Sequence, residues 1–118
     1  MKKRLVLWMV RLLLRRAPIA RIEFPRLNRS YLVLDEASAW APSHVGGTAM
    51  PEQSGNCVLQ FAEFNEVQLG DEIVLRPNVG EALRYRVRGQ IAPQRVMQTR
   101  TRMLTLVTGR YAIVATPA

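Results

Sequence analysis

The sequence predicts an all-β fold, either a β-sandwich or a β-barrel, with a short amphipathic helix before it. One indication is a change of period at Ile19, where helical spacing of apolar residues gives way to alternation. Another is a series of short apolar segments separated by Gly, Pro and Asn turns, among which 83–89 alternates strictly. With 118 residues, 48% of them hydrophobic, the chain is long enough for one small folded domain.

The first 17 residues form a basic and apolar head. The first 30 residues contain nine Lys and Arg and one acid, whereas the rest of the chain holds eight of each sign. The run 5–14 is apolar except for Arg11, which is about half of the ~20 residues that a bilayer span requires. We therefore expect 1–17 to form an amphipathic helix that lies on a membrane surface and ends at Pro18. A signal peptide with a poor cleavage site, a helix packed on its own domain and a frayed tail are the alternatives.

Residues 18–118 form the body, which contains no internal linker or repeat. Strand-like patterns occur at 19–24, 31–34, 56–60, 72–76, 83–89, 103–108 and 110–115. A barrel would close the sheet edges along which small β-proteins aggregate. Only Gly109 separates the last two segments, and its freedom to adopt positive φ suits so tight a connection. If that turn failed, the last strand would be left unpaired.

The composition excludes several kinds of site and partner. The single cysteine, Cys57, rules out an intramolecular disulfide and a Cys-rich zinc site, and the single histidine, His44, leaves little room for a His-based metal cluster. Four acids crowd one region, but their spacing fits no calcium loop and indicates a charged loop. They are Glu63, Glu66, Asp71 and Glu72. We expect no metal or organic cofactor, and no nucleic-acid partner because the body carries no net charge.

Segments spread along the body resemble, in chain order, the motifs of sortases. Pro18–Leu27 is similar to the opening strand of that family, and Leu69–Ile73 to its Pro-Gly-Asp-Glu turn. Ala41–Val58 resembles the family's Gly-Pro-Gly-His…Gly-Thr…Pro…Gly-Asn segment. Three strands complete the series: Leu83–Val87, which resembles the family's Tyr-Arg-Tyr-Arg-Val strand, Leu-Thr-Leu-Val-Thr at 104–108, and the closing strand at 110–114. The ordered set covers nearly all of 18–116 and is closest to sortases of Gram-negative bacteria.

The resemblance implies a closed eight-stranded β-barrel, shortened here, held at the periplasmic face of the inner membrane by an N-terminal anchor. The implied activity of the lineage is cysteine transpeptidation, which cleaves a Leu-Pro-x-Thr-Gly-like sorting signal through a thioester and transfers the acyl group to an amine. A His acts as acid and base, and an Arg steadies the oxyanion or the substrate. The implied partners are the sorting-signal peptide of a surface protein and, through 1–17, the membrane surface.

The sequence departs from the sortase pattern at two of the three positions that carry this chemistry. After the Leu-Thr-Leu-Val-Thr strand the family has Cys and a loop, whereas here Thr108 is followed by Gly109 and Arg110. The Gly-Asn strand of the family leads into a catalytic His, whereas here it leads into Phe61. Arg110 alone matches the family's catalytic arginine. We therefore expect a sortase-like barrel that is inactive in transpeptidation and retains at most peptide or partner binding.

Other residues offer weak replacements for the absent pair. Cys57 begins an apolar strand and is expected to be a buried inert thiol, with His44 as a loop histidine. Neither Thr105 nor Thr108 has a base beside it in the sequence. Arg110 has a plain alternative as a strand-end arginine that faces solvent or pairs with an acid such as Glu63 or Asp71.

Two rival functions stay open at this point. One is an active cysteine peptidase or transpeptidase with a rearranged site built on Cys57. The other is a non-catalytic basic barrel that binds acidic lipid or nucleic acid, through its head or through the arginine stripe of one strand. That stripe comprises Arg84, Arg86 and Arg88, and it is expected to be a solvated strand face because no aromatic residues that could stack on bases alternate with it.

Overall fold

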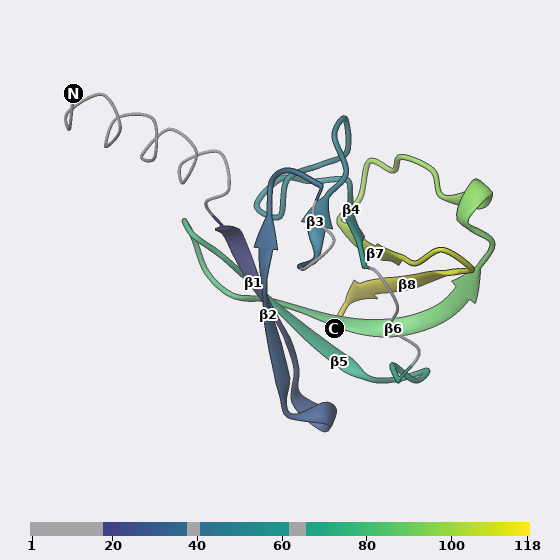
Figure 1. Cartoon of the computed structure of the whole chain (residues 1–118), viewed down its shortest axis with the longest axis horizontal. Coiled ribbons are helices and arrows are strands. Elements are labelled where there is room, and N and C mark those ends of the chain that lie inside the picture. Colours follow the sequence, from purple (N-terminus) through teal and green to yellow (C-terminus); the bar gives the residue numbers. More distant parts are fainter. Residues whose placement is uncertain (1–17, 38–40, 62–65) are drawn as a thin grey trace, which may run out of the picture.

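A computed structural model describes residues 18–37, 41–61 and 66–118, and it confirms the all-β prediction (Figure 1). The expected helix over 1–17 lies outside the described residues. The strands are β1 (Pro18–Phe24), β2 (Arg29–Leu34), β3 (Ser43–His44), β4 (Asn56–Gln60), β5 (Glu72–Pro77), β6 (Leu83–Ile91), β7 (Met103–Val107) and β8 (Ala112–Pro117). Two 3₁₀ turns, η1 (Pro25–Leu27) and η2 (Pro93–Arg95), follow β1 and β6.

The eight strands close into a barrel in the order β1-β2-β3-β4-β7-β8-β6-β5, with β5 pairing back onto β1. Two neighbouring pairs, β2/β3 and β4/β7, are parallel, and the others are antiparallel. Because β4 and β7 run side by side in the same direction, they end at the same end of the barrel, where β8 begins. This arrangement decides which parts of the chain meet at the candidate site.

The sequence pattern located seven of the strands to within a few residues and missed β3. Ser43–His44 has two residues, which is too short for any alternation to be visible. The two 3₁₀ turns were also missed, although each begins at a proline. The last pair of strands is shorter at the turn than expected, because β7 ends at Val107 and β8 begins at Ala112.

The barrel interior is filled by one face of each strand. In β6 the inward side chains of Tyr85 and Val87 are buried, while Arg84, Arg86 and Arg88 lie outside and exposed, as their alternation predicted. Among the described residues, fifteen buried side chains form one apolar core to which seven of the eight strands contribute. The strands of the barrel are thus held together by a continuous core.

A buried polar network joins the start of β4 to its neighbours. The amide nitrogen of Asn56 donates to the carbonyl of Met97 at 2.9 Å, and its oxygen accepts from the Thr105 hydroxyl at 2.7 Å. Both side chains are at most 2% exposed, so their polar atoms depend on one another for hydrogen bonds. Thr105 therefore has a structural role across the parallel β4/β7 pair.

Candidate functional site

The candidate site lies at the barrel end where β4 and β7 finish and β8 starts. The register places Gln60 beside Val107, and Val107 beside Ala112. The amide of Phe61 donates to the carbonyl of Val107 at 2.8 Å. Thr108 therefore lies next to Phe61, the residue that follows β4, so the two positions at which the sequence departs from the sortase motifs come together in space.

The turn from β7 to β8 is closed by a threonine rather than by an unusual glycine conformation. The Thr108 amide donates to the carbonyl of Tyr111 at 2.9 Å. The Thr108 hydroxyl oxygen lies 3.3 Å from the Tyr111 amide and 3.4 Å from the Arg110 amide, both of which it can accept. Gly109 is not among the glycines with positive φ, so that expectation was wrong. The last strand is fully paired, with β7 on one side and β6 on the other.

Arg110 occupies the tip of this turn and is exposed. Within the described residues, its guanidinium has no hydrogen-bond or ion-pair partner. Of the two acids suggested for it, Asp71 is bound by Arg26 instead, and Glu63 lies outside the described residues. Nothing in the described part of the chain therefore occupies the Arg110 guanidinium.

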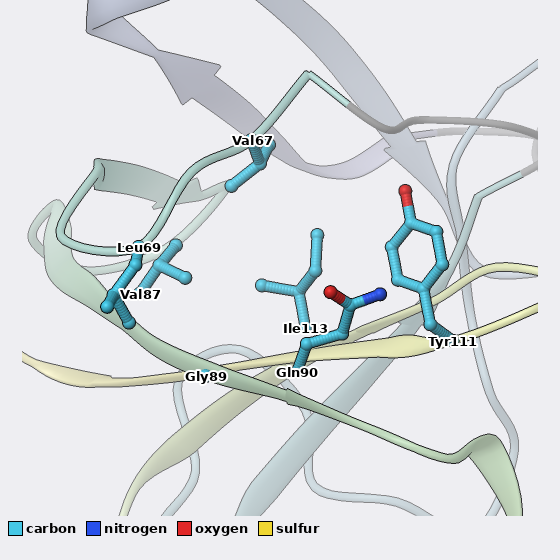
Figure 2. A pocket seen from close by; sticks show the side chains of 7 residues that line it. All are labelled: Val67, Leu69, Val87, Gly89, Gln90, Tyr111 and Ile113. Carbon is cyan, nitrogen blue, oxygen red and sulfur yellow. The ribbon is translucent and has the colours of Figure 1, made fainter.

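A cavity of about 400 Å³ opens beside the turn. Figure 2 shows Val67 and Leu69, from the loop before β5, on one side of it, and Tyr111, Gln90 and Ile113 on the other. Its lining is apolar apart from the Gln90 amide and the Tyr111 hydroxyl, which suits an aliphatic group carrying hydrogen-bonding atoms. Sequence reasoning missed this cavity, because its two sides come from segments about twenty residues or more apart in the chain.

A bulge in β6 helps to shape the cavity. The pairing with β8 shifts between Val87 and Gly89, after which Gln90 lies opposite Ile113. A glycine inside a strand often marks such a bulge, so Gly89 was the one available signal. The extra residue turns the end of β6 and brings Gln90 to the cavity rim.

The loop wall of the cavity is tied to the hairpin of β1 and β2. The Arg26 guanidinium donates to both carboxylate oxygens of Asp71, at 2.8 and 3.0 Å, and to the carbonyl of Glu66 at 2.6 Å. The Asp71 side chain, only 11% exposed, also accepts from the Gln68 amide at 2.9 Å. A second pair joins Arg29 to the Glu66 carboxylate at 2.7 Å. The Arg26 guanidinium lowers the pKa of Asp71, so the carboxylate is charged and holds the loop.

Cys57 lies in the core and away from the turn. Its side chain is 2% exposed, and burial raises the pKa of the thiol to about 12. A thiolate is the reactive form of cysteine, so the arrangement opposes the active-site reading based on Cys57. His44 is on β3 and pairs with Leu59 rather than with Cys57.

The ring of His44 is also occupied. Its Nε2 lies 2.9 Å from the carbonyl of Ala49 and 3.0 Å from the Thr48 hydroxyl, and its Nδ1 is 3.8 Å from a carboxylate oxygen of Asp35. The carbonyl can only accept, so Nε2 donates to it. The histidine was expected in a loop, whereas it is 8% exposed and belongs to a strand.

The three exposed arginines of the β6 stripe each donate a hydrogen bond to another residue of the protein. Arg84 donates to the Glu72 carboxylate at 2.5 Å, Arg86 to the carbonyl of Gly70 at 2.9 Å, and Arg88 to the Thr116 hydroxyl at 2.8 Å. This favours the solvated-face interpretation over a free patch for anionic polymers. The acids Glu66, Asp71 and Glu72 each bind a different arginine. Of the four acids expected in a charged loop, Glu72 belongs to β5, and Glu63 lies outside the described residues.

Comparison with known proteins identifies the fold. No family model and no curated protein matches the sequence. Among solved structures, a sortase D5 transpeptidase of Clostridium perfringens superimposes with a TM-score of 0.71 at 21% identity, covering 86% of this chain and 79% of that one. Sortase E of Streptomyces avermitilis gives 0.65 at 20% identity, with coverage of 83% and 84%. Sortase A of Corynebacterium diphtheriae gives 0.72 at 20%, with coverage of 87% and 61%. The chain has a sortase-like fold, as the motifs predicted.

Proposed function

We propose that this barrel binds an extended sorting-signal-like peptide at the β4/β7 end and does not carry out cysteine transpeptidation. The observation that supports this most directly is the exposed Arg110, which lacks a partner among the described residues and precedes Tyr111, a residue that lines an apolar cavity, with no cysteine at the turn. A guanidinium presents several donors to peptide carbonyls. The neighbouring cavity has room for an aliphatic side chain.

The second half of the proposal rests on the chemistry that thioester formation needs. A cysteine must be ionised or deprotonated by a neighbouring base before it attacks a carbonyl. The chain has one cysteine, whose thiol is buried with a pKa of about 12, so about one molecule in 10⁵ carries a thiolate at pH 7. The one histidine binds Ala49 and Thr48 instead.

We further propose that residues 1–17 hold the barrel at a membrane surface, on the periplasmic face of the inner membrane. The support is the sequence pattern of the head, with its arginines and its aliphatic run. In the part of the chain that the structure describes, no helix is both long and apolar enough to cross a bilayer.

The test measures binding and cleavage of the same peptide. A fluorescently labelled Leu-Pro-x-Thr-Gly peptide is titrated with the full chain, and its anisotropy reports binding. We expect Arg110→Gln to weaken the affinity about tenfold, because charge-assisted hydrogen bonds are lost. Arg21→Gln, an exposed arginine on β1, is the matched control and is expected to bind as the parent does.

Cleavage is followed by chromatography of the same mixtures with an added amine. We expect no product from the parent chain or from Cys57→Ala. Product formed by the parent and lost in Cys57→Ala would overturn the inactive assignment. A peptide that fails to bind, or that binds the Arg110 and Arg21 variants equally, would overturn the peptide-binding assignment.

A further inference from the structure

A second cavity, of about 460 Å³, lies at the opposite end of the barrel. Ser54 and Arg102, which line it, stand just before β4 and β7, the two strands that run toward the candidate site. Leu83 and Tyr85 at the start of β6, and Pro117 at the end of β8, complete this part of its wall. The cavity therefore shares no residue with the site at the β7/β8 turn.

Tyr85 brings an unsatisfied polar atom to this cavity. Its side chain is 1% exposed, and its hydroxyl oxygen is buried without a hydrogen-bond partner in the described part of the chain. Buried polar groups are nearly always hydrogen-bonded, so an exception calls for a partner from outside the chain. The cavity that Tyr85 lines gives such a partner a place.

Arg102 brings an unpaired positive charge to the same cavity. Arg102 is half-buried, and within the described residues its guanidinium has no hydrogen bond and no ion pair. Tyr85 and Arg102 both line this cavity, and burial raises the pKa of Tyr85 to about 12. Arg84 also lines the cavity, but its charge is balanced by Glu72 at 2.5 Å. Of the two arginines that line the cavity, Arg102 is therefore the one without a partner among the described side chains; Ala118 lines the same cavity.

We propose that this cavity binds a phosphate group through the Arg102 guanidinium and the Tyr85 hydroxyl, with the Ser54 hydroxyl at its edge. Guanidinium and hydroxyl donors match the acceptor oxygens of phosphate. Phosphate would satisfy the buried hydroxyl and neutralise the free arginine at the same time. The apolar side chains of Leu83 and Pro117 offer contacts to an organic group attached to it.

The cavity lies at the end of the barrel from which β1 starts. The last pair of β5 and β6 joins Leu75 to Leu83, and Asn78, just after β5, donates to the carbonyl of Pro18 at 2.6 Å. The start of β1 and the loop before β6 lie side by side in Figure 1. The basic head therefore joins the barrel at this end. The phosphate that the cavity binds can belong either to a lipid headgroup or to a free phosphate compound.

The binding test uses inorganic phosphate on the full ¹⁵N-labelled chain, at constant ionic strength set with chloride. We expect saturable amide shifts around Leu83–Tyr85 and Arg102, with little change at Gln90 or Ile113 in the other cavity. Arg102→Gln should weaken phosphate affinity about tenfold or more, because it removes the charged donor. Arg100→Gln, an exposed arginine two residues away that does not line the cavity, is the matched control and should bind as the parent does.

The Tyr85→Phe variant distinguishes specific phosphate binding from general electrostatic screening of a chain whose net charge is +8. This variant keeps the ring and the charge, so screening would leave its response unchanged, whereas loss of the hydroxyl should weaken phosphate affinity several-fold. It also keeps the test decisive if Arg102→Gln does not fold. Equal affinity in the parent, Tyr85→Phe and Arg100→Gln, or shifts that do not saturate, would overturn the proposal.

Vesicles distinguish the two sources of phosphate. The head is expected to bind anionic vesicles by itself, so the readout is the difference between Arg102→Gln and Arg100→Gln on phosphatidylglycerol vesicles. A weaker binding of Arg102→Gln alone identifies a lipid headgroup as the ligand. Equal vesicle binding, together with the Arg102-dependent response to inorganic phosphate, identifies a free phosphate compound. Independence from Arg102 in both measurements would contradict the site.

Discussion

At the residue scale, the burial of Cys57 decides how the chain reacts with thiol reagents. With a pKa of about 12 in the folded state, against its ordinary value of 9.0 in an unfolded chain, the thiolate fraction at pH 8 falls by about 10³-fold on folding. We expect iodoacetamide to label the native protein at least that much more slowly than the protein in guanidinium. Rapid labelling of the native protein at pH 8 would show an accessible, activated thiol and revive the rearranged-site hypothesis.

The Thr105 hydroxyl donates a hydrogen bond to one buried acceptor, the side-chain oxygen of Asn56. Thr105→Val keeps the shape of the side chain but leaves the Asn56 amide oxygen, 2.7 Å away, without this donor. We expect a loss of about 1–3 kcal/mol in the free energy of unfolding, measured with urea. Thr101→Val, at an exposed position, should change it by no more than about 0.5 kcal/mol. Equal losses in the two variants would show that the Asn56 oxygen has another partner.

At the scale of elements, the β7/β8 turn depends on Thr108. Thr108→Ala removes the oxygen that lies 3.3 Å from the Tyr111 amide and 3.4 Å from the Arg110 amide. We expect a loss of about 1 kcal/mol in the free energy of unfolding, together with faster hydrogen exchange of these two amides. Unchanged exchange at both amides in Thr108→Ala would show that backbone pairing alone sets the turn.

The Arg26–Asp71 pair should make the cavity wall sensitive to acid. The pKa of Asp71 is lowered, chiefly by its hydrogen bonds to Arg26. The stability it contributes is therefore present above its ordinary value of 3.8 and is lost as pH falls through the lower folded value. We expect Asp71→Asn to lower Tm at pH 7 and to flatten the fall of Tm below pH 4. Glu81→Gln, at an exposed site, should do neither; a parallel acid profile for Asp71→Asn would contradict the assignment.

Sequence patterns predicted the strands better than they predicted the candidate site. Alternation located β6 because its outward arginines and inward Tyr85 and Val87 repeat every two residues. No local pattern reports that β4 and β7 lie side by side and parallel, since their residues are nearly fifty positions apart. Arg110 was found because it sits in a motif. Val67 carries no motif, and it lines the cavity from a loop that the Arg26–Asp71 pair ties to the β1/β2 hairpin.

At the scale of the whole molecule, two side chains that could ionise, Cys57 and Tyr85, are buried inside the barrel. Cys57 and Tyr85 both point into the common core, and burial raises the pKa of each to about 12. Both groups are therefore neutral in the folded barrel well above the pH at which they ionise in an unfolded chain. Because both groups lie in the core, the free energy of unfolding of the whole fold should depend on pH in the alkaline range.

The sign of this coupling follows from which state releases protons first. As pH rises above the ordinary values of 9.0 for Cys57 and 10.0 for Tyr85, the unfolded chain ionises while the folded barrel does not. The free energy of unfolding should therefore fall between pH 9 and 12, by at most about 1.4 kcal/mol per pH unit for each group. Urea titrations across this range should show the slope reduced in Tyr85→Phe and reduced further when Cys57→Ala is added. A slope that both variants leave unchanged would mean that neither group ionises more readily on unfolding, and that the barrel end beside Arg102 is open to hydroxide in the native state.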